Sequence, residues 1–341
     1  MKTAFFRPYL LNLALLVTAL VLSVAAGAVA LPPLALLQRV IERLTGWVLL
    51  VDWPQSFEVI VFRIRLPHTI LVTLTGAALA GSGAAYQALF RNPLADPYLI
   101  GVASGAGLGA VVAMALREQG FALGLYGVPL GAFGGALLTV GVVYTLAHLR
   151  RGEATTTLIL AGIAVSSFAT ALTSYLMLRS QGELHRAVAW LLGGATLDGW
   201  EPVLAALPYI VLGLGVLVAS GYAMNVLQFG EEQAGQLGLP VRRVKLLIIL
   251  AASLATAAAV AFSGIIGFIG LIVPHLARLL WGADYRRLLP LSVLGGASAL
   301  LLADLLARLV LAPQELPVGI ITALAGAPFF LWVLLRSPRR S

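Results

Sequence analysis

The chain has 341 residues, of which 60% are hydrophobic and only 11% are charged, with a mean hydropathy of +0.98. Water-soluble domains carry about 25% charged residues, so this composition predicts an integral membrane protein. The net charge of +8 would suggest nucleic acid in a soluble protein, but these cations lie in short loops between apolar runs, so no nucleic-acid partner is expected. The absence of cysteine excludes disulfides and thiolate metal sites, and four scattered histidines predict no metal centre.

Apolar runs long enough to cross a bilayer follow one another along the chain. The first, 9–30, is longer than the apolar core of a signal peptide (~7–15 residues), so we expect a retained anchor. The stretch 244–280 would form a helix of ~55 Å, too long for one crossing, so we divide it at Ser263-Gly264. The other predicted spans are 66–90, 98–116, 123–147, 155–178, 203–227, 288–309 and 316–335.

Ten spans place both termini on one side of the membrane. With the N-terminus inside, fourteen of the 22 Lys and Arg residues fall on the cytoplasmic side, as the positive-inside rule requires. We therefore predict an all-α protein in one transmembrane domain, residues 1–341, with about ten helices and cytoplasmic N- and C-termini. Outside, 34–50 predicts an amphipathic helix within a periplasmic segment at about 32–57. The segment 187–197 is expected to turn back toward the bilayer.

Charged residues are nearly absent from the predicted spans. Asp304 and Arg308 are four residues apart near one span end and should pair. No ionisable residue is evident near a midplane, where a proton- or sodium-driven carrier usually keeps one. No nucleotide-binding P-loop sequence occurs either. A transported solute would therefore need energy from a partner; a self-sufficient carrier and an intramembrane enzyme remain the alternatives.

One polar segment, 229–245, interrupts the apolar pattern on the predicted cytoplasmic side. Its acidic start, Glu231-Glu232, suits a short helix, and Gly238 and Pro240 should end that helix. From the residues alone, the segment is either an ordinary solvated loop or a docking element for the missing ATPase.

Five sequence blocks, in order, carry a family resemblance. They read R-L-P (65–67), G-A-A-Y-Q-A-L-F-R-N-P-L-A-D-P (83–97), G-E-E-Q-A-G-Q-L-G-L-P (230–240), G-I-I-G-F-I-G-L-I-V-P-H (264–275, with Arg278 after it), and L-P-V-G with G-A-P-F-F (316–319 and 326–330). From about residue 60 to the C-terminus, the chain resembles the FecCD-type permeases. These are the membrane subunits of type II ABC importers for vitamin B12, haem and ferric siderophores.

The resemblance implies partners and a fold. It implies the type II importer permease fold in a homodimer, with two cytoplasmic ATPase subunits and one periplasmic binding protein, in the bacterial inner membrane. The chain itself would be non-catalytic and hold no cofactor, since ATP and magnesium would bind the ATPase. The residues implied to contact that ATPase are Gly230, Glu231, Glu232, Gln233, Ala234, Leu237, Gly238, Pro240, Arg242 and Arg243.

At the outer face, the resemblance implies that Arg65 and Arg308 pair with glutamates of the binding protein. A third family arginine is His68 in this chain, and Arg63 could replace it. The predicted pair with Asp304 would compete with a partner's glutamate for Arg308.

For the pathway, the resemblance implies gates at Asn92 and Leu94 and at Thr155 and Thr156. Five further residues share one face of the fifth span by their i, i+3, i+4 spacing: Ser166, Thr170, Thr173, Ser174 and Met177. Hydroxyls on one face either join helices or line a cavity, and the sequence leaves both open. We expect import of an iron chelate, a ferric siderophore or haem; vitamin B12 is the alternative.

Overall fold

The computed structural model describes residues 2–27, 38, 41–42, 45–46, 55–121, 124–149, 154–180, 182–194, 199–312 and 314–336. Throughout these ranges the regular elements are helices. The predicted amphipathic segment at 32–57 lies mostly outside the described residues.

Each of the ten predicted spans contains a helix, although 98–116 and 203–227 are each divided into two helical elements. Among the residues that the structure describes, six helices are long and apolar enough to cross a membrane by length and composition: α1 (Lys2–Ala25), α6 (Gly127–Leu149), α7 (Ala154–Arg179), α9 (Glu201–Ala219), α12 (Val241–Ser263) and α14 (Tyr285–Val310). The remaining spans correspond to α4 (Leu66–Phe90), α5 (Val102–Glu118), α13 (Ile269–Trp281) and α15 (Val318–Arg336). Short elements join them: α3 (Gln55–Val59), η1 (Ile60–Arg65), η2 (Pro97–Ile100), α8 (Leu184–Leu191), α10 (Gly221–Leu227) and α11 (Glu231–Gln236).

Helix α4 lies at the centre of the molecule, and every residue from Thr75 to Phe90 is buried. Small residues let its neighbours approach closely, which suits helix packing in membranes. A methyl group at Gly76 would collide with the Gly296 carbonyl of α14, and one at Gly83 with the Gly270 carbonyl of α13. Glycine at these crossings therefore sets the distance between the central helices.

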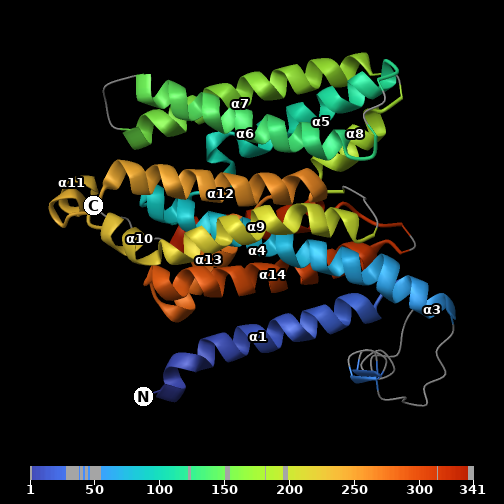
Figure 1. Cartoon of the computed structure of the whole chain (residues 1–341), viewed down its shortest axis with the longest axis horizontal. Coiled ribbons are helices and arrows are strands. Elements are labelled where there is room, and N and C mark those ends of the chain that lie inside the picture. Colours follow the sequence, from blue (N-terminus) through green and yellow to red (C-terminus); the bar gives the residue numbers. More distant parts are fainter. Residues whose placement is uncertain are drawn as a thin grey trace.

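The other helices flank this centre on two sides (Figure 1). Helices α5, α6 and α7 form a group along one edge, and α1 lies along the opposite edge, packed on α14. Helices α1 and α14 run in the same direction, since Tyr9 lies near Arg287 at one end and Ser23 bonds Arg308 at the other. The α11 end of the bundle and the α3 end thus lie far apart.

The loop after α4 turns back into the bundle, which corrects the single predicted span at 98–116. A methyl group at Gly270 would come within 2.8 Å of both the Leu79 carbonyl and the Pro97 ring. Leu79 lies eleven residues before Phe90, about 16 Å along α4. The chain therefore rises to the middle of α4, forms the short helix η2 there, and only then begins α5.

The predicted division at Ser263-Gly264 is confirmed. Helix α12 ends at Ser263, and α13 begins at Ile269 after Phe268, which adopts a left-handed conformation with φ of 69°. The predicted turn at 187–197 is described up to residue 194. There, α8 and the following turn pack against this break and the start of α15, where the Gly319 amide donates to the Leu192 carbonyl (3.1 Å).

Candidate functional site

The polar segment forms a small exposed helix, α11, at one end of the bundle (Figure 1). The chain enters it through Gly230 (φ 105°) and leaves through Gly238 (φ 85°), conformations that favour glycine. Pro240 then caps α12, so the predicted helix and its stop are confirmed. The buried Ala234 anchors α11, and Lys245 bonds Glu231 (2.7 Å). The other predicted contact residues lie on the surface: Glu232, Gln233, Leu237, Arg242 and Arg243.

Beneath α11, a chain of hydrogen bonds leads to the central helix. Asn225 of α10 donates to Asp284 (2.6 Å), and this bond is the main cause that lowers the pKa of Asp284 below its ordinary value. Asn225 also accepts from the Tyr285 amide (2.8 Å). The Tyr285 hydroxyl accepts from Arg278 (2.8 Å), and Arg278 donates to Gln87 of α4 (3.3 Å). Helix α10 is thus joined to α14, and through it to α13 and α4, by polar contacts.

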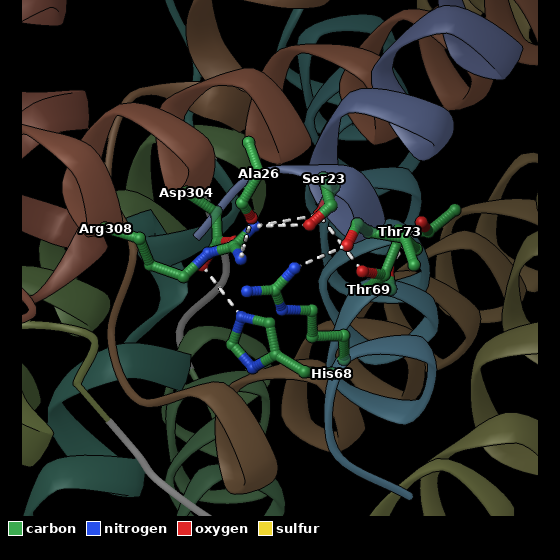
Figure 2. Close-up of polar contacts among 9 residues, drawn as sticks. Ser23, Ala26, His68, Thr69, Thr73, Asp304 and Arg308 are labelled. Carbon is green, nitrogen blue, oxygen red and sulfur yellow. Dashed lines mark hydrogen bonds and ion pairs between the residues drawn. The ribbon is translucent and has the colours of Figure 1, made fainter. Parts of the chain in front are cut away.

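At the opposite end, a polar network joins α1, α4 and α14 (Figure 2). Arg308 Nε contacts Asp304 Oδ2 at 3.0 Å, which confirms the predicted pair, and His68 Nε2 contacts Asp304 Oδ1 at 3.0 Å. Arg308 also donates to the Ser23 hydroxyl (2.9 Å) and carbonyl (3.2 Å). The Ser23 hydroxyl bonds that of Thr69 (3.0 Å).

Both predicted docking arginines bind carbonyls at the end of α1. Arg65 donates to the carbonyls of Val24 (2.9 Å) and Ala25 (3.2 Å), while Arg308 donates to that of Ala26 (3.3 Å). The last carbonyls of a helix lack partners within the helix, and cations satisfy them well. We call this group the α1 clasp: Ser23, Arg65, His68, Thr69, Asp304 and Arg308.

The clasp leaves little of these arginines accessible. Arg65 is 9% exposed, and the Arg308 side chain is also 9% exposed. A partner's glutamate would have to replace the bonds to α1 in order to reach either guanidinium. His68, with 41% of its side chain exposed, and the exposed Arg63 are the accessible members of the predicted docking set.

A groove runs along α7 between α5, η2 and the α12–α13 break. It consists of two adjoining hollows of about 700 and 560 Å³. The residues predicted on one face of the fifth span line it: Ser166, Thr170, Thr173, Ser174 and Met177. The sequence left two interpretations open, in which these hydroxyls either join helices or line a cavity. Each interpretation fits some of these residues.

Individual hydroxyls in the groove differ in their contacts. Ser166 accepts from Ser104 of α5 (3.0 Å), so it joins two helices as well as lining the groove. Thr173 is buried and bonds back to the Ala169 carbonyl within its own helix (2.8 Å). Thr170 and Ser174 are exposed and line both hollows. These two side chains are therefore the ones that a solute in the groove would meet.

The predicted gate residues lie on two separate elements. Asn92 and Leu94 share one turn, in which the Leu94 amide donates to the Asn92 side chain (2.9 Å). Thr156 is exposed in the first turn of α7; the Thr155 side chain lies outside the described part of the structure.

Sequence reasoning missed Asp96, which the re-entrant loop carries into the groove. Asp96 lies between two long apolar runs, 66–90 and 98–116, and not within either of them. The signal was the spacing of Pro93, Pro97 and Gly101, which predicts a turn rather than a direct connection. Within the described ranges, no group of three or more His, Asp or Glu residues is placed to hold a metal ion.

Comparisons with known proteins agree along almost the whole chain. A family model described as the FecCD transport family matches residues 15–336. The cobalamin import system permease protein BtuC of Halobacterium salinarum is 48% identical over 281 residues, which cover 82% of this chain and 74% of that protein. The hemin transport system permease protein HmuU of Yersinia pestis is 44% identical over 280 residues, which cover 80% and 82%.

The fold agrees with a solved structure described as an inward-facing transporter of the metal-chelate ABC type. The TM-score is 0.80 at 32% sequence identity, and the match covers 97% of this chain and 99% of the other. The relatives are transport permease subunits, and the apolar helices described above make this chain a multi-pass protein of the inner membrane. The chain therefore belongs to the FecCD transport family of ABC importer permeases.

Proposed function

We propose that this chain is the membrane subunit of an importer in which a separate ATPase binds α11 and a binding protein docks at the α3 end. The proposal includes a second copy of the chain beside the first, two ATPase subunits and one binding protein, with the α11 end in the cytoplasm. ATP and magnesium bind the ATPase in this proposal, and the cargo moves along the groove beside α7.

The observation that carries the proposal is the exposed α11 next to α10, which is itself joined to the central helix by the Asn225–Asp284–Tyr285–Arg278–Gln87 contacts. A helix of six residues with an acidic first turn and an exposed Leu237 offers a soluble partner both charge and apolar surface. A movement of α11 that displaces α10 would reach α4 through these side chains.

For the cargo, we propose a metal chelate, with a corrinoid such as cobalamin as the first candidate and haem as the second. The sequence had favoured an iron chelate. A relative named for cobalamin import is 48% identical, and one named for hemin transport is 44% identical, which supports this order. The groove also suits a large chelate, because its lining is mostly apolar with hydroxyls along one side.

For docking, we propose that Arg63 and His68 make the first contact with the binding protein. Arg65 and Arg308 would take part only after the clasp opens. Arg63→Glu should therefore weaken association more than Arg65→Ala, and the effect should be larger at low salt because exposed charges are screened by ions.

The function is tested by uptake into proteoliposomes. The complex should accumulate radiolabelled cobalamin, or haem as the second probe, when its ATPase is active. A hydrolysis-defective ATPase should abolish accumulation. Uphill uptake by the chain without any ATPase would contradict the proposal. A thermal-shift screen of the cognate binding protein against cobalamin, haem and a ferric siderophore would identify the cargo directly.

A further inference from the structure

Asp96 is a carboxylate inside a groove whose other lining residues carry no formal charge. It contributes to the wider hollow of about 700 Å³ together with Ser166, Ser167, Thr170 and Ser174 of α7. The neighbouring hollow adds only uncharged side chains. Among the residues that the structure describes, no lysine or arginine forms an ion pair with Asp96.

A structural role accounts for only one oxygen of this carboxylate. Asp96 Oδ1 accepts from the Tyr98 amide (2.8 Å) and caps the short helix η2. Asparagine and serine cap helices about as well as aspartate does, so capping does not require a negative charge at this position. In the part of the chain that is described, this is the one hydrogen bond formed by the carboxylate.

The position of the carboxylate is fixed by the packing of the re-entrant loop. A methyl group at Gly162 of α7 would collide with the Leu99 carbonyl, so η2 lies directly against α7. The Tyr98 hydroxyl donates to the Ile266 carbonyl (2.9 Å) and ties the other side of η2 to the α12–α13 break. Asp96 is thus held beside the hydroxyl face of α7 by contacts on two sides.

We propose that Asp96 sets the charge selectivity of the groove. Its carboxylate gives the lining a negative potential, which favours cationic chelates and neutral chelates with amide N–H donors, and disfavours anionic chelates. The inference rests on the proposed function, because it requires the groove to be the cargo path. It separates the two candidate cargoes by chemistry: a corrinoid carries neutral amides, whereas haem carries two carboxylates.

The absence of native cysteine permits a direct test with the full-length chain in lipid nanodiscs. Thr170→Cys supplies one thiol in the groove. Its reaction rates are measured with 2-(trimethylammonio)ethyl and 2-sulfonatoethyl methanethiosulfonate, which are cationic and anionic reagents of similar size. The ratio of the two rates is divided by the same ratio for free 2-mercaptoethanol. A carboxylate also shifts the thiol's own ionisation, but this affects both rates equally and cancels in the ratio.

With Asp96 present, the corrected ratio should favour the cation about tenfold, as expected for one unit charge a few ångströms away. Asp96→Asn and Asp96→Ser keep a capping acceptor and should bring the ratio close to one. Asp96→Glu keeps the negative charge and should retain the preference for the cationic reagent. Glu201→Gln removes a carboxylate that lines neither hollow, and should leave the ratio unchanged.

The outcomes distinguish this inference from the proposed path. Rapid labelling of Thr170→Cys with the same corrected ratio in the presence of Asp96 and in the Asp96→Asn variant would overturn the charge selectivity. It would leave the groove as a water-accessible path. Failure of Thr170→Cys and Ser174→Cys to react with either reagent would overturn the path itself, and the inference with it.

Discussion

At the scale of single residues, the α1 clasp joins three helices through side chains and backbone carbonyls. One carboxylate, Asp304, bonds both His68 and Arg308, and Arg308 in turn holds the end of α1. Removing one member of a buried ion pair is costly because it leaves the other charge and its acceptors without partners. The clasp is therefore expected to contribute to stability as well as to any role in docking.

Arg308→Ala should lower the free energy of unfolding by about 3 kcal/mol, because Asp304 loses its ion pair with Arg308 and the carbonyls of Ser23 and Ala26 lose their donor. The matched control is Arg63→Ala at the same end, an exposed residue whose loss should change stability by less than about 0.5 kcal/mol. Unfolding in mixed micelles, followed by tryptophan fluorescence, measures both. Equal effects of the two substitutions would contradict the clasp.

The lowered pKa of Asp284 predicts that the stability of the fold depends on pH. Its pKa in the folded chain lies below the ordinary value of 3.8, chiefly because Asn225 donates a hydrogen bond to it. A lowered pKa stabilises the fold above pH 3.8, and this contribution is lost as the pH falls through the folded value. Asn225→Leu should therefore lower the melting temperature more at pH 7 than at pH 3. If Asn225→Leu lowers the melting temperature by the same amount at pH 7 and at pH 3, the hydrogen bond does not act through the charge of Asp284.

At the scale of elements, glycine determines how closely helices meet. The crossing of α4 and α13 has no space for a side chain at Gly83, where a methyl group would collide with the backbone of Gly270. Other helical glycines, such as Gly141 of α6, have no atom within 4 Å of the position a methyl group would take. The same residue type is thus essential at one helix and replaceable at another.

Gly83→Ala should destabilise the fold by about 3 kcal/mol, since the helices must separate and the packing around α4 is lost. Gly141→Ala should be neutral, or stabilising by up to about 1 kcal/mol, because alanine favours helix and meets open space. Thermal unfolding of both variants in the same detergent tests the contrast. A neutral Gly83→Ala would mean that α4 and α13 do not lie as close as the structure places them.

At the scale of the whole molecule, the surfaces proposed for the two partners lie at opposite ends of one bundle. The α11 end presents exposed acids and an apolar side chain, and the α3 end presents Arg63 and His68. Between them lie α4, which is buried, and the groove along α7. This arrangement suits transport because a partner at either end can act on the same central helices.

The double substitution Glu231→Lys with Glu232→Lys should abolish association with the ATPase, since it reverses the charge of the first turn of α11 and removes the bond to Lys245. The chain should still insert and remain folded, because both side chains are exposed. Co-purification of a tagged ATPase measures the effect. Glu183→Lys, a reversal outside the α11 segment, is the control, and an equal loss there would argue against α11 as the contact.

The sequence by itself determined the class of the protein, the ten helical runs, the polar helix at 231–236 and the family. These follow from local features: apolar length, the position of glycine and proline, and residue order within short blocks. The Asp304–Arg308 pair was also predictable, because i, i+4 spacing places both side chains on one helix face.

Only the tertiary structure decided what surrounds the candidate site residues. Arg65 and Arg308 are forty or more residues from the end of α1, and no local pattern indicates that they bind its carbonyls. The loop at 91–101 contains two charged residues and two prolines, which predicts a connection outside the bundle, yet packing against α4, α7 and α13 folds it inward. Burial and charge environment depend on contacts between distant segments, so the position of Asp96 in the groove could be learned only from the folded chain.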